Sequence, residues 1–238
     1  ITLGTGNVSL TGDSTLKAGT DQTLTVGSGN VNWVGLSTVQ AGTTFNLVIG
    51  TGDFSTAGTT RIGAGELLSA HVERGNARFV GDTELRSQGD VSLGTGEGDI
   101  DLTQRSEVIA EDAVQIYTRR AGHFVMADAQ TRISAGTLAD VRTVGDVRID
   151  LIEAGAQVNL VSLAGSVLDN TLAETDLVLA PSVYFSAMTG IGLPWVDNLN
   201  IQADVVEALN TGSVGINLQN RQAVTVGERS VVNTGTGD

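Results

Sequence analysis

Hydrophobic and polar residues alternate in short segments along most of the chain, and Gly, Asn, Asp or Thr separate the segments. Near the start, three such segments follow one another, with the sequences NVSL, STLKA and QTLTV. Alternation with a period of two is typical of strands that bury one face, and Gly with Asn or Asp marks turns. A helical period is suggested only over residues 203–209, where the repeat described next predicts a strand. The pattern therefore predicts an all-β chain.

The segments recur every 23 residues. One column of this repeat contains Gly6, Gly29, Gly52, Gly75 and Gly98. The column that follows it contains Asn7, Asn30, Asp53, Asn76 and Asp99. The register then drifts by a few residues and returns near the end of the chain, where Asn210 and Asn233 are again 23 apart. The chain therefore holds about ten units of one repeat, the signature of a stacked architecture.

Three short strands per unit cannot bury a face alone, but stacked units can, since each strand pairs in parallel with its copy about 4.8 Å away. We therefore expect a parallel β-helix (solenoid) of about ten rungs, with right-handed winding as the default for parallel crossovers. The column from Asn7 to Asp99 is expected to form a side-chain ladder at one corner. One β-helix segment of a longer chain is expected over 1–238, with regular rungs over 1–164, looser rungs over 165–209 and a regular, truncated rung over 210–238.

Composition agrees with this fold and excludes several functions. The 31 Gly suit the tight turns at the corners. Pro is scarce (2 residues) because it has no backbone N–H to donate to a neighbouring strand. The absence of Cys excludes disulfides, Cys-ligated zinc and thiol catalysis. A net charge of −14 argues against nucleic acid as a partner, and no apolar run is long enough for a transmembrane helix.

Charged residues concentrate in the middle rungs, where nine of the 13 cationic residues lie between Arg74 and Arg148. The 23-residue register predicts three ion pairs between rungs: Arg61 with Glu84, Arg78 with Asp101, and Asp82 with Arg105. We interpret them as solvated ladders of alternating charge. The alternative is a polysaccharide-cleaving face on which two carboxylates act as acid and base. Its candidate residues are Asp99, Asp101, Glu107 and Arg78.

The remaining candidate residues are two histidines and two aspartates. By register His123 occupies the inward column of Val8, and we interpret it and His71 as structural residues at a corner or core edge. Residues 94–102, GTGEGDIDL, are similar to the Gly-Asp calcium repeat of RTX proteins, so Asp99 and Asp101 are candidate calcium ligands. No other cofactor is predicted, because the sequence has no P-loop, nucleophile elbow or zinc-protease motif.

Three stretches carry a resemblance to a known family: IEAGAQVNLVSLAGSVLDN (152–170), LVLAPSVYFSAMTGIG (177–192) and LNIQADVVEALNTGSVGINLQNRQAVTVG (199–227). In the order of these phrases the chain resembles giant bacterial repeat adhesins of the filamentous-haemagglutinin type. The resemblance implies a secreted or cell-surface bacterial protein without enzymatic activity that serves as a stalk, adhesive fibre or matrix element. Its implied partners are a host cell, matrix or polysaccharide surface, or copies of itself. A polysaccharide-active β-helix and a phage or virus fibre domain remain alternatives.

Overall fold

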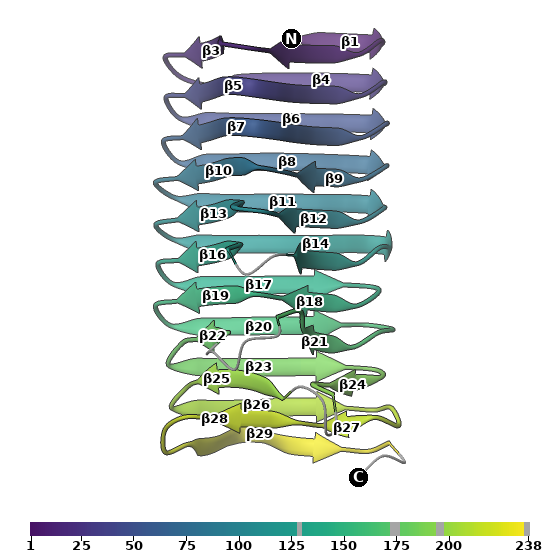
Figure 1. Ribbon diagram of the computed structural model, residues 1–238, viewed down its shortest axis with the longest axis vertical. Helices are drawn as coiled ribbons and strands as arrows, with labels where there is room; N and C mark the ends of the chain where they lie inside the picture. The colour runs from purple at the N-terminus through teal and green to yellow at the C-terminus, as the bar shows by residue number, and fades with distance from the viewer. Residues whose placement is uncertain (128–129, 172–176, 194–197, 236–238) are drawn as a thin grey trace.

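The chain folds into a right-handed β-solenoid. The computed structural model describes residues 1–127, 130–171, 177–193 and 198–235, and all regular elements within these ranges are strands. The strands lie across the long axis in successive layers, from the N-terminus at one end to the C-terminus at the other (Figure 1). The nearer strands run right to left and the farther ones left to right as the chain descends, which is right-handed winding (Figure 1).

Three faces enclose the solenoid, and we name them by their strands. The long sheet consists of β1 (Thr2–Thr5), β4 (Gln22–Ser28), β6 (Thr44–Thr51), β8 (Leu67–Arg74), β11 (Asp90–Glu97), β14 (Ala113–Ala121), β17 (Leu138–Thr143), β20 (Gln157–Ser162), β23 (Ser182–Ala187), β26 (Val205–Asn210) and β29 (Thr225–Asn233). The first short face consists of β2 (Val8–Thr11), the first halves of β5 (Val31–Ala41) and β7 (Phe54–Ala64), β9 (Ala77–Phe79), β12 (Ile100–Thr103), β15 (Phe124–Ala127), β18 (Val147–Ile149), β21 (Val167–Asp169), β24 (Gly190–Ile191) and β27 (Gly215–Ile216). The second short face consists of β3 (Ser14–Ala18), the second halves of β5 and β7, β10 (Asp82–Ser87), β13 (Glu107–Ala110), β16 (Arg132–Ala135), β19 (Leu151–Ala154), β22 (Val178–Leu179), β25 (Leu199–Gln202) and β28 (Leu218–Asn220).

The register of these parallel strands confirms the 23-residue repeat. In the long sheet Leu24 pairs with Leu47, and Leu47 pairs with Ala70. The spacing changes in the middle of the chain. Strand β14 contains one more residue than β11 between two consecutive ladder pairs, and the later register pairs Glu107 with Arg132 and Arg132 with Leu151. The ambiguous stretch 203–209 is part of strand β26 and its approach, as the repeat predicts. The looser stretch 165–209 includes 172–176 and 194–197, which lie outside the described residues.

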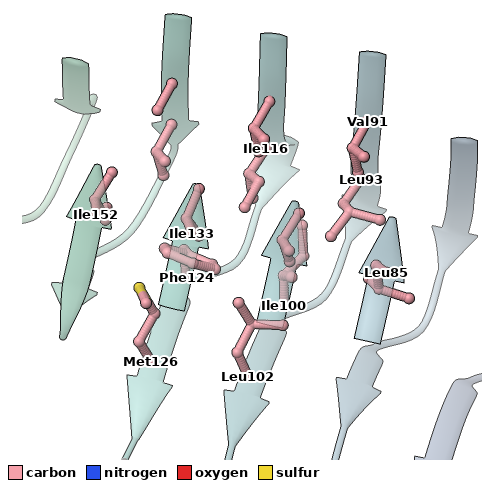
Figure 2. Packing of buried hydrophobic residues seen from close by; sticks show 14 of the residues in the cluster. Leu85, Val91, Leu93, Ile100, Leu102, Ile116, Phe124, Met126, Ile133 and Ile152 are labelled. Atoms are coloured by element: carbon pink, nitrogen blue, oxygen red, sulfur yellow. The ribbon is translucent and has the colours of Figure 1, made fainter. Parts of the chain in front are cut away.

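The core is a set of apolar columns that run along the solenoid. Inward positions of all three faces alternate with outward ones, and the inward side chains are almost completely buried. Figure 2 shows how the inward side chains of β12 and β15, among them Ile100, Leu102 and Phe124, meet those of the neighbouring strands. A row of buried aromatic rings, Trp33, Phe54 and Phe79, crosses rungs in edge-to-face contact. Each rung therefore buries its apolar side chains against the rungs above and below.

Candidate functional site

A hydrogen-bonded ladder runs along the corner between the long sheet and the first short face. The side-chain oxygen of Asn7 accepts a hydrogen bond from the backbone N–H of Asn30 (2.8 Å), and that of Asn30 accepts one from Asp53 (2.9 Å). The same bonds link Asp53 to Asn76 (2.8 Å) and Asn76 to Asp99 (2.9 Å). In these bonds a backbone N–H donates to a side-chain oxygen. The column therefore pairs the N–H groups at the corner that the hydrogen bonds between strands leave unpaired. Asn and Asp alternate freely because both provide the acceptor.

His123 continues this ladder. Its backbone N–H donates to Asp99 Oδ1 (2.9 Å), its ring Nδ1 accepts from the N–H of Asp146 (2.8 Å), and Asp146 Oδ1 accepts from Ser166 (2.9 Å). The prediction that His123 occupies an inward column is wrong. The extra residue in β14 shifts the register by one, so that Phe124 pairs with Ile100 and fills the core. The His123 side chain is half exposed at the corner.

The four residues proposed for a polysaccharide-cleaving face do not form one cluster. Asp101 projects from the first short face and accepts a hydrogen bond from Arg78 Nε (3.2 Å), while Asp99 belongs to the corner ladder. Glu107 begins β13 on the second short face, where its ladder neighbours are Glu84 and Arg132. The two carboxylates nearest to each other, Asp99 and Asp101, are thus engaged with separate partners.

The pKa of Asp101 lies above its usual value. Partial burial of the carboxylate is the main cause, the negative charge of Asp99 acts in the same direction, and Arg78 opposes both. The ionised form of Asp101 is therefore less favourable in the folded protein than in the unfolded chain. The loss of stability begins as the pH rises through about 3.9, the pKa of an aspartate in the unfolded chain. It is complete above the pKa that Asp101 has in the folded protein.

We expect Asp101→Asn to raise the thermal midpoint at pH 7, because the amide cannot ionise. The gain should be at most about 2–4 °C, the shift that 1 kcal/mol produces in a chain of this size, and it should vanish as the pH falls below about 3.9. Thermal melts followed by circular dichroism from pH 3 to 8 measure it. Asp82→Asn is the matched control, since Asp82 also pairs with an arginine but is more exposed (40% against 24%). Equal losses of stability in both variants at pH 7 would contradict the expectation.

All three predicted ion pairs between rungs are confirmed. Arg61 lies 3.6 Å from Glu84, Arg78 lies 3.2 Å from Asp101, and Arg105 Nη2 donates to Asp82 (2.7 Å). These arginine side chains are more than half exposed, so each pair stabilises the fold by only a few tenths of a kcal/mol.

A shallow hollow of about 270 Å³ lies beside these pairs on the second short face. It exists because Gly63 leaves one outward position without a side chain, between Gln40 and Arg86 in the neighbouring rungs. Arg61 and Glu84 line the same hollow. It offers polar contacts but little enclosure.

A cluster that sequence reasoning missed lies on the outer surface of the long sheet. In one column His71, Gly94 and Tyr117 follow each other in register, and a side chain at Gly94 would overlap the Tyr117 ring. Tyr117 therefore lies along the solenoid axis over Gly94, with its ring 6.0 Å from that of His71 and only 24° from parallel. The guanidinium of Arg119 lies over the same ring at 5.1 Å. The 23-residue register, with a glycine between two rings, is the sequence signal that could have found this cluster.

Carboxylates beside this cluster are held by Arg120. Its guanidinium donates to Glu97 (2.9 Å) and to Glu73, and His71 Nε2 lies 3.1 Å from Glu73 Oε2. The hydrogen bond with His71, followed by that with Arg120, lowers the pKa of Glu73. The hydrogen bonds with Glu97 and Glu73 raise the pKa of Arg120. Glu73 therefore remains ionised at neutral pH, and both carboxylates are paired with Arg120.

Over the described ranges, no group of three or more His, Asp or Glu side chains is placed to hold an ion. Asp99 and Asp101 each accept a hydrogen bond within the chain, and calcium binding by them stays a prediction. The described part of the chain also contains no helix capable of crossing a membrane.

Comparisons with family models, curated proteins and solved structures find no match to this chain. The resemblance to filamentous-haemagglutinin-type adhesins therefore rests on the sequence phrases alone. Function has to be inferred from the geometry of the solenoid and its outer faces.

Proposed function

We propose that the chain is a structural rod segment of a large secreted or cell-surface bacterial protein, in which it serves as a stalk, fibre or matrix element rather than as an enzyme. One observation carries the proposal: the eleven strands of the long sheet pair in chain order without interruption, and the apolar columns continue beneath them. A solenoid of this kind is stiff along its axis, because every rung is joined to the next on three faces.

The direction of the hydrogen bonds explains this stiffness. In a parallel solenoid the ladder bonds run along the rod axis, so each rung is joined to the next by the bonds of all three faces. About ten rungs at about 4.8 Å give a rod of about 48 Å. Such a segment projects whatever lies beyond it to a fixed distance from a surface.

Single-molecule stretching between tethers at the two ends tests this role. We expect discrete rupture events whose summed gain in contour length is about 750–800 Å, because the extended chain reaches about 3.3–3.6 Å per residue. A disordered linker of equal length in the same tethers is the control. Smooth extension at the forces that stretch the linker would contradict a load-bearing role.

The second candidate function is binding or cleavage of a polysaccharide. Cleavage by Asp99, Asp101 and Glu107 loses support because Asp99 and Asp101 are engaged with separate partners and Glu107 lies on another face. Binding gains support from the rings and arginines on the long sheet, such as Tyr117 and Arg119. A rod that also binds a polysaccharide would act as an adhesive fibre.

A further inference from the structure

In the part of the chain that the structure describes, three arginines of the long sheet lack the ion pairs that arginines such as Arg61 and Arg78 make on the two short faces. Arg74, Arg119 and Arg142 have no carboxylate within ion-pair distance among the described residues, and all three are exposed. Arg74 ends β8, Arg119 lies in the bulged part of β14, and Arg142 of β17 is the register neighbour of Tyr117. In a protein with a net charge of −14, Arg119 over the Tyr117 ring and Arg142 beside it in register form a local site for an anion.

Both tyrosines of the chain lie on the outside of this sheet. Tyr117 belongs to β14 and Tyr184 to β23, three rungs further along, or about 14 Å along the axis. Each carries an arginine over its ring, with Arg119 at 5.1 Å and Arg229 at 4.9 Å. The large aromatic side chains that are fully buried, in contrast, are Trp33, Phe45, Phe54, Phe79, Phe124 and Phe185. Core packing therefore does not account for the placement of the tyrosines.

The local backbone supports the arrangement at Tyr117. The bulge in β14 brings Arg119 and Arg120 together at the outer surface, and bulges commonly redirect side chains in this way. Arg120 is fixed by Glu73 and Glu97, which leaves Arg119 to stack on the ring. Beneath this layer Nδ1 of His71 is buried without a hydrogen-bond partner.

We propose that the long sheet between His71 and Tyr184 binds a polymer of hexuronate residues that lies along the rod axis. Arginine forks match the geometry of carboxylates, and the two tyrosine rings hold Arg119 and Arg229 in place at the surface. The two rings are too far apart for a single sugar, so an extended chain is the ligand that engages both. The proposal goes beyond a purely mechanical role, because it assigns a ligand to one face.

The charges around the site favour a sparse polyanion over a dense one. Glu73, Glu97, Asp140 and Glu207 project from the same sheet among the arginines. A chain with one carboxylate per sugar can place its charges beside the arginines and its uncharged parts beside these carboxylates. Duplex nucleic acid carries about one charge per 1.7 Å of its axis, so it would meet stronger repulsion from the same carboxylates.

Isothermal titration of the whole chain with hexagalacturonate at low ionic strength tests the proposal. We expect binding that weakens as salt is added, and none by the neutral maltohexaose. Arg119→Gln and Arg142→Gln should each weaken binding about fivefold, the upper range for an exposed charge pair, and together about 25-fold. Tyr117→Ala should bind about three- to tenfold more weakly, because it removes the ring on which Arg119 rests.

Arg61→Gln is the matched control, because it removes an exposed arginine from another face. Far-ultraviolet circular dichroism verifies that each variant is folded. Failure of hexagalacturonate to bind, equal binding of maltohexaose, or tighter binding of polyphosphate would each overturn the proposal. Equal weakening of binding by Arg61→Gln and Arg119→Gln would also overturn the proposal. None of these results bears on the stretching experiment. The proposal of a ligand site and the proposal of a structural rod are therefore tested independently.

Discussion

Gly75→Ala is expected to lower the free energy of unfolding by about 4 kcal/mol, the sum of two costs. Gly75 has φ of +138°, a region that side chains with a Cβ rarely adopt, which costs about 1–3 kcal/mol. Its new Cβ would also overlap the carbonyl oxygen of Gly52 in the preceding rung, and overpacking costs about another 1–3 kcal/mol. Denaturation by guanidinium chloride, followed by circular dichroism, measures the loss.

Two other glycines separate these costs. Gly6 occupies the same column with φ of +129°, but no atom lies within 4 Å of the place that a Cβ would take there, so Gly6→Ala should show the backbone cost alone. Gly27 has no positive φ, yet its Cβ would overlap the carbonyl oxygen of Gly4, so Gly27→Ala should show the packing cost alone. If Gly75→Ala and Gly6→Ala lower the free energy of unfolding by the same amount, the close stacking of the corners contributes nothing to stability.

Most of the fold can be predicted because the environment of a residue recurs 23 positions later. The alternation of apolar residues defines the inward columns, and the register places Arg61 beside Glu84 and Arg78 beside Asp101. This logic fails where the period changes by one residue. The bulge in β14 lengthens this repeat to 24 residues, so a strict 23-residue register puts His123 in the core although Phe124 occupies that place.

The outer surface is less predictable, since no packing rule fixes which way an exposed side chain leans. The register puts His71, Gly94 and Tyr117 in one column, but only the structure shows that the Tyr117 ring lies over the glycine. The sequence predicts the corner ladder as contacts among side chains. The ladder instead consists mainly of backbone N–H groups that donate to Asn and Asp side chains such as Asn30 and Asp53.

Phe54→Ala is expected to cost about 3–5 kcal/mol, the usual range when a buried phenylalanine is truncated. Phe54 is fully buried, and its ring stands edge-on to Trp33 of the rung before (4.9 Å between centroids) and to Phe79 of the rung after (5.4 Å). The substitution therefore removes contacts to both neighbouring rungs and leaves a cavity between them. Phe54→Leu keeps much of the volume and should cost clearly less.

A double-mutant cycle shows whether these rings couple adjacent rungs. We expect Phe54→Ala and Phe79→Ala together to cost about 0.5–1.5 kcal/mol less than the sum of the single variants, the range for an edge-to-face aromatic pair. In stacked repeats the interfaces between neighbours decide whether the array unfolds as one unit or repeat by repeat. Additive losses would mean that the aromatic row does not couple the rungs. Coupling of the expected size would show that the aromatic row joins adjacent rungs of a solenoid that has no disulfides.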